Sequence, residues 1–120
     1  MSRASATIVV LEENAAAQEL IDQLLRREGN RVLITNNPME ILGLAKRVRI
    51  DLVVGDVDQL EVAEPQLAAK IRSVAHVLQV STGYRSSPHA ADALRLVAPF
   101  SLDDLDEAVA LALGRLKALE

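Results

Sequence analysis

The sequence predicts a single α/β domain, in which a parallel sheet is covered by helices on both faces. Of the 120 residues 50% are apolar and only 2% aromatic, so one aliphatic core can form. Strand-like aliphatic runs alternate with amphipathic helical segments five times, the pattern of right-handed crossovers in a doubly wound sheet. The chain has no cysteine, which excludes disulfides and thiolate metal sites. We expect one domain over 1–120, with Leu119-Glu120 set aside as a tag-derived remnant.

The expected strands are short runs rich in Val, Ile and Leu that stop at polar residues or at proline. Strands buried on both faces of a parallel sheet have this nearly continuous apolar character. The first and third of them end in carboxylates, Glu12-Glu13 and Asp56 respectively. The expected strands are 7–11, 31–35, 51–56, 77–81 and 95–98.

Helix starts are marked by local capping signals. Asn14 precedes an apolar i, i+3, i+4 pattern that Gly29 closes, and Asn37 stands before a proline at the first helical position. The last helix has the strongest signal, because Ser101 is followed three residues later by Asp104. These three positions predict the first, second and last helices.

The connections on either side of the fourth strand are expected to be short. Residues 57–65 are polar and loop-like, and 66–72 hold about two helical turns. Ser87-Pro88 then begins a short alanine-rich helix. We therefore expect the third and fourth helices to be shortened.

The functional edge of such a sheet is the one at which its strands end. Ligands bind outside the carboxyl ends of the strands, beside the point where the strand order reverses. With the order 2-1-3-4-5, the first and third strands are neighbours, and Glu12, Glu13 and Asp56 converge. Thr82 follows the end of the fourth strand on the same edge.

Four segments together resemble the receiver domain of bacterial two-component response regulators, over essentially the whole chain. The segment 8–13 matches a strand followed by an acidic pair, and 51–56 matches the phosphoacceptor strand. The segments 82–84 and 99–101 match later landmarks of the family. The resemblance implies a flavodoxin-like (βα)5 fold with the strand order 2-1-3-4-5 and a role in phosphorelay signalling.

The resemblance also implies roles for individual residues. Asp56 would accept the phosphoryl group, and Mg²⁺ would be held by Glu12, Glu13, Asp56 and the Asp58 backbone carbonyl, since this cation prefers oxygen ligands. Thr82 would contact the aspartyl phosphate through its hydroxyl, or Ser81 if the register differs by one residue. A histidine kinase or an output domain would be the partner.

Three departures from the family pattern weaken this chemistry. Ala98 stands where the family has a lysine that binds the phosphoryl group, and Arg95 stands where it has a switching aromatic residue. The acidic pair is Glu12-Glu13, whose side chains are longer than those of the usual pair containing aspartate. We expect weak Mg²⁺ binding and an atypical receiver, with weak or no phosphorylation, that acts through protein contacts and is not an enzyme.

Two alternatives remain open at this point. One is a conventional Mg²⁺-dependent phosphoacceptor that uses Asp56 and tolerates Ala98. The other is a flavodoxin-like domain that binds a small ligand or acts as an enzyme, which the lack of a glycine-rich loop after the first strand disfavours. Each carboxylate also has a structural interpretation. Glu12 and Glu13 would suit the start of the following helix, and Asp56 would be a structural acid at a strand end.

Charge and hydropathy limit the classes of partner. The net charge is −4, and the basic residues are dispersed, so nucleic-acid binding by this domain is not expected. No apolar run approaches the length that spans a membrane. We expect a cytoplasmic protein that is a monomer or a weak homodimer.

Overall fold

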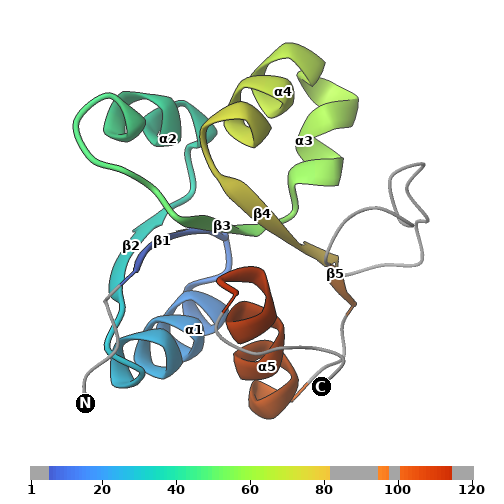
Figure 1. Cartoon of the computed structure of the whole chain (residues 1–120). Coiled ribbons are helices and arrows are strands. Elements are labelled where there is room, and N and C mark those ends of the chain that lie inside the picture. The colour runs from blue at the N-terminus through green and yellow to red at the C-terminus, as the bar shows by residue number, and fades with distance from the viewer. Residues whose placement is uncertain (1–5, 82–94, 98–100, 115–120) are drawn as a thin grey trace.

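A computed structural model describes residues 6–81, 95–97 and 101–114, and these form a parallel sheet between two layers of helices (Figure 1). The strand order is β2-β1-β3-β4-β5, and every neighbouring pair is parallel. This confirms the doubly wound sheet and its order. The strands are β1 (Thr7–Leu11), β2 (Arg31–Thr35), β3 (Leu52–Gly55), β4 (His76–Ser81) and β5 (Arg95–Val97).

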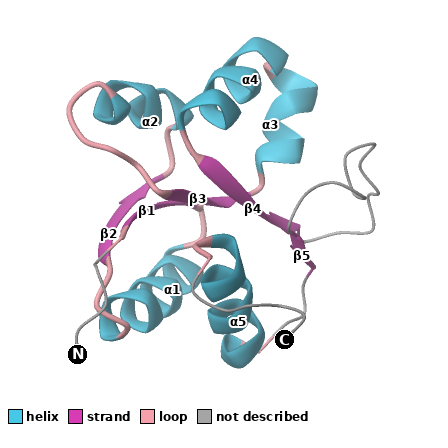
Figure 2. Ribbon diagram, in the orientation of Figure 1, coloured by secondary structure: helices cyan, strands magenta, loops and turns pink. Residues whose placement is uncertain are grey.

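The helices divide between the two faces of the sheet (Figure 2). One face carries α1 and α5, and the other carries α2, α3 and α4. The helices are α1 (Ala15–Arg27), α2 (Pro38–Ala45), α3 (Val57–Ala63), α4 (Pro65–Val74) and α5 (Leu102–Ala112). Among the described residues, no helix has the length and apolar character needed to cross a membrane.

Alternate residues of the central strands supply two separate cores. Ile8 and Val10 of β1 face α1 and α5, where they join Leu25 and Leu105. Val9 faces the other way, toward the core beneath α2, α3 and α4. This alternation is the period-2 geometry of a strand with both faces covered, and it fixes which side chains the strand ends present.

The predicted caps are confirmed where the structure describes them. Asn14 Oδ1 accepts a hydrogen bond from Ala17 N at 2.9 Å, and Asn37 caps α2 in the same manner. Ser101 and Asp104 form the expected reciprocal capping box at α5. The predicted short helix after Ser87-Pro88 lies outside the described residues.

The connection between β3 and β4 differs from the prediction. The sequence predicts a loop over 57–65 and then one shortened helix over 66–72, whereas the chain forms α3 and then α4. The loop prediction is wrong because Asp56 caps α3, accepting a hydrogen bond from Gln59 N at 3.0 Å, and Val57, the first residue of α3, is fully buried. Pro65 then begins α4 at a position that suits its fixed φ.

Candidate functional site

The ends of β1 and β3 bring the predicted carboxylates to one edge of the sheet. Leu11 and Gly55 are register partners, so Glu12 and Asp56 each follow the last residue of neighbouring strands. Glu12, Glu13 and Asp56 line one cavity of about 380 Å³. The cavity is bounded further by Leu11, Asn36, Pro38, Gln59, Leu60, Ala63 and Val80.

Glu12 takes part in the start of α1. Its Oε2 accepts a hydrogen bond from Asn14 N at 3.1 Å, and its backbone carbonyl accepts one from Gln18 Nε2. Its backbone N donates to Thr35 O of β2 at 3.1 Å. Glu12 is partly buried, whereas Glu13 beside it is exposed. The two acids therefore share the cavity but differ in how firmly they are held.

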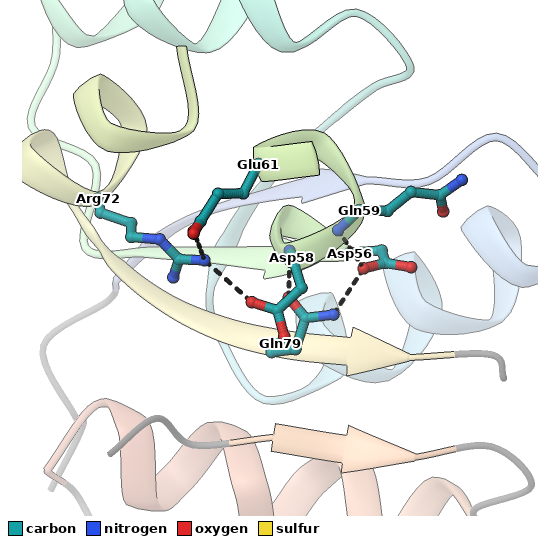
Figure 3. A network of polar contacts seen from close by, with 6 residues as sticks. All are labelled: Asp56, Asp58, Gln59, Glu61, Arg72 and Gln79. Atoms are coloured by element: carbon teal, nitrogen blue, oxygen red, sulfur yellow. Dashed lines mark hydrogen bonds and ion pairs between the residues drawn. The ribbon is translucent and has the colours of Figure 1, made fainter. Parts of the chain in front are cut away.

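Asp56 receives two hydrogen bonds on the same oxygen. Its Oδ1 accepts from the backbone N of Gln59 at 3.0 Å and from Nε2 of Gln79 at 2.7 Å (Figure 3). The first bond caps α3, and the second crosses to β4. The carboxylate is thus oriented by one helix and by the neighbouring strand.

Asp58 links the same region to α4. Its backbone N donates to Gln79 Oε1 at 2.8 Å, and its carboxylate accepts from Arg72 Nη2 at 3.0 Å. Arg72 Nη2 also contacts Glu61 Oε1 at 3.1 Å. The network drawn in Figure 3 therefore ties the end of β3, the first turn of α3, β4 and α4 to one another.

Several solved structures share this fold. No family model and no curated protein matches the sequence. The receiver domain of the sensor histidine kinase PA1611 from Pseudomonas aeruginosa superposes with a TM-score of 0.67 at 20% identity, covering 92% of this chain and 99% of that one. A response regulator from Thermotoga maritima superposes with a TM-score of 0.72 at 24% sequence identity, and the match covers 92% of this chain and 99% of that one. The receiver domain of the hybrid histidine kinase CckA superposes with a TM-score of 0.68 at 26% sequence identity, and the match covers 90% of this chain and 99% of that one.

This chain has the fold of a response-regulator receiver domain. The structure of the Pseudomonas receiver contains a magnesium ion coordinated in its active-site cleft. In this chain Glu12 and Asp56 lie at the ends of β1 and β3, the edge at which doubly wound sheets bind ligands.

The side chains at this edge do not make a ready cation site. Within the described residues, no group of three or more His, Cys, Asp or Glu side chains is arranged to hold a metal ion. Asp58 lies in the first turn of α3, and a helical carbonyl is directed along the axis toward the C-terminal end of its helix. Oδ1 of Asp56 is already bound by two N–H donors. As arranged, these residues do not fit Mg²⁺.

The remaining predicted receiver positions are only partly described. Thr82 and Ala98 lie outside the described residues. Ser81 is the last residue of β4 and Arg95 the first of β5, and Arg95 is the register partner of Gln79. The roles of Thr82, Ser81, Arg95 and Ala98 therefore stay predictions from the sequence.

The sequence analysis missed two residues of the network around Asp56 and Asp58, namely Gln79 and Arg72. Gln79 is a polar residue that is only 1% exposed. It lies in β4 between two aliphatic residues, Leu78 and Val80. A lone amide inside an aliphatic strand was the available signal, because buried polar side chains require partners. Arg72 gave no comparable signal, since a basic residue near a helix end is common.

Proposed function

We propose that this chain is a two-component receiver module with weak or no phosphorylation at Asp56, which acts through contacts with a histidine kinase or an output domain. The observation that carries the proposal is the double hydrogen bond on Asp56 Oδ1. A phosphoacceptor must present a carboxylate oxygen to an incoming phosphoryl group. In this chain one carboxylate oxygen, Oδ1, instead caps α3 and binds Gln79, and these two N–H donors fix the rotation of the carboxylate and weaken it as a nucleophile.

The sequence supports the same proposal at two other positions. Ala98 has no cation with which to bind a phosphoryl group, and Arg95 replaces the aromatic residue of the family pattern. A modification shifts a conformational equilibrium only by its difference in affinity for the two states. With these contacts absent, phosphorylation has little means of changing the surface, so the partner would bind a surface that does not depend on it.

A conventional phosphoacceptor is the second candidate, and one observation favours it. Glu12, Glu13 and Asp56 line the same cavity beside the ends of β1 and β3. Small side-chain rotations there would bring carboxylate oxygens closer together. An enzymatic role has no comparable support, and we propose a signalling module in the cytoplasm that does not bind nucleic acid.

Incubation with Mg²⁺ and acetyl phosphate, followed by intact-mass measurement, tests the proposal. We expect little or no mass increase under conditions that fully modify a conventional receiver treated in parallel. Asp56→Asn is the matched control, because it removes the acceptor and keeps an oxygen for the Gln59 and Gln79 donors. A stoichiometric phosphate adduct in the parent chain that is absent from Asp56→Asn would establish the conventional phosphoacceptor instead.

Mg²⁺ binding gives a separate measurement. Octahedral coordination near 2.1 Å tolerates misplaced oxygens poorly, so we propose affinity no tighter than roughly millimolar. Calorimetric titration of the parent chain, with a Glu12→Gln, Glu13→Gln double variant as control, measures it. Saturable binding in the low micromolar range that the double variant loses would contradict weak binding.

A further inference from the structure

Gln79 is one of two buried polar residues in the part of the chain that the structure describes, the other being Asn30. Gln79 lies on the face of β4 opposite to Leu78 and Val80, which belong to the core beneath α1 and α5. An aliphatic residue would satisfy a buried strand position at no cost in hydrogen bonds. The presence of a glutamine at this buried position must therefore be explained by the hydrogen bonds that its side chain makes.

Both ends of the Gln79 amide bind the candidate site. Nε2 donates to Asp56 Oδ1 at 2.7 Å, and Oε1 accepts from Asp58 N at 2.8 Å. These partners fix the amide orientation, because a carboxylate can only accept here and a backbone N–H can only donate. Figure 3 shows the side chain of Gln79 reaching from β4 to the start of α3 between these two residues.

The consequence falls on one oxygen of Asp56. Oδ1 is shared by the Gln79 amide and Gln59 N, so a phosphoryl group or a cation approaching that oxygen must displace both donors. The same two donors fix the rotation of the carboxylate and draw charge from it, which makes Oδ2 a weaker nucleophile as well. Displacing the amide also breaks a 2.7 Å hydrogen bond of a side chain that is only 1% exposed, which is unfavourable. Arg72 adds rigidity, because it binds Asp58 and Glu61 and so holds the first turns of α3 in place.

We propose that Gln79 is a positioning residue that holds Asp56 as a helix cap and thereby suppresses its phosphorylation. This inference rests on the proposed receiver function and names the contact responsible for the low reactivity. In the suppressed reaction, a carboxylate oxygen of Asp56 attacks the phosphorus of acetyl phosphate. The bond from phosphorus to the acetyl oxygen breaks, acetate leaves with the electron pair, and an aspartyl phosphate forms.

Gln79→Met tests the inference, since methionine has a similar length but lacks the amide. With saturating acetyl phosphate and Mg²⁺, we expect adduct formation at Asp56 to become roughly tenfold faster, the factor that corresponds to one hydrogen bond of ordinary net strength. The matched control is Gln66→Ala, because Gln66 is an exposed glutamine of α4 outside the network drawn in Figure 3. The control should stay within about twofold of the parent rate.

The outcomes separate the inference from the proposed function. Rapid modification of the parent chain contradicts the proposed weak phosphorylation, whatever Gln79→Met does. A slow parent and an equally slow or unmodified Gln79→Met overturn the inference and leave the proposed function intact. A rise of the same size in Gln66→Ala also overturns it, because the effect would then not be specific to the Gln79 amide.

A second measurement covers the case in which Gln79→Met does not fold. The side-chain amide signals of Gln79 and of the exposed Gln66 of α4 can be followed by NMR in the parent and in Asp56→Asn. We expect the Gln79 signals to shift when the carboxylate charge is removed and the Gln66 signals to stay in place. Unchanged Gln79 signals would overturn the inference, because the amide would not be bound to Asp56.

Discussion

At the scale of single residues, Gly55 of β3 packs closely against Leu11 of β1 beside the candidate site. A Cβ on Gly55 would lie 2.5 Å from Leu11 O and 2.9 Å from Leu11 Cβ. Backbone atoms of a central strand cannot move aside without disturbing the register on both sides. Gly55 therefore lets β1 and β3 approach closely, and this close approach sets the positions of Glu12 and Asp56.

Gly55→Ala should lower the free energy of unfolding by about 2 kcal/mol, the usual size of an overpacking penalty in a filled core. Urea denaturation measures the change. Gly43→Ala is the matched control, because a Cβ there meets nothing within 4 Å and Ala favours the interior of a helix by roughly 0.5–1 kcal/mol. Equal stability of Gly55→Ala and the parent would show that β1 and β3 can separate without cost.

At the scale of elements, what could be predicted from the sequence depended on how local the signal was. The caps at Asn14, Asn37 and Ser101 bind backbone groups two or three residues away, so sequence spacing contained the information. The start of α3 is equally local, since Asp56 precedes Gln59 at the spacing of a helix-start signal. It was missed because residues 57–65 were interpreted as a polar loop, which left no helix there for Asp56 to cap.

The contacts of Gln79, unlike the caps, join residues that are far apart in the sequence. It binds Asp56 and Asp58, which are 23 and 21 residues away in the chain. Only the register of β3 with β4 brings these residues together. The strand register cannot be deduced from the spacing of residues in the sequence. The strand order and the acidic edge were thus predictable from repeated patterns, whereas the partner that occupies Asp56 was not.

The capping box of α5 gives a test at this scale. Ser101 Oγ accepts from Asp104 N at 3.0 Å, and Asp104 Oδ2 accepts from Ser101 N at 3.2 Å. Ser101→Ala should therefore lower the free energy of unfolding by about 1 kcal/mol. Chemical denaturation is the measurement, and Ser101→Asn, which keeps an acceptor at the cap, should remain close to the parent. An equal loss in both variants would mean that the cap is not the cause.

At the scale of the whole molecule, exposed apolar residues are spread over both faces of the sheet. Among the described residues, Leu20 of α1 and Leu102 of α5 lie on one side, and Met39, Val62 and Val74 lie on α2, α3 and α4 on the other. Leu33 and Ile34 are neighbours in the edge strand β2, each 37% exposed. Apart from this pair they are isolated along the chain, and exposed apolar residues that occur singly are normal on monomeric proteins. This distribution favours a monomer or a weak homodimer over a tight one.

Sedimentation equilibrium tests that expectation. The chain should sediment as a monomer at low micromolar concentration, and self-association should appear only at far higher concentration. Leu102→Ser, on the exposed side of α5, serves as a control that should leave the monomer mass unchanged. A stable dimer at low micromolar concentration would contradict the expectation, and its loss in Leu102→Ser would locate the interface at α5.

The central claim is that the surface of this receiver fold does not depend on phosphorylation at Asp56. Amide NMR spectra before and after addition of Mg²⁺ and beryllofluoride, a stable mimic of the phosphoryl group, test it most directly, with Asp56→Asn as the control. We predict only small, non-saturating shifts near Glu12 and Asp56, and none in α4 or α5, because the Gln79 amide already binds Asp56 Oδ1 at 2.7 Å. Saturable shifts that extend to α4 and α5 and vanish in Asp56→Asn would contradict the claim.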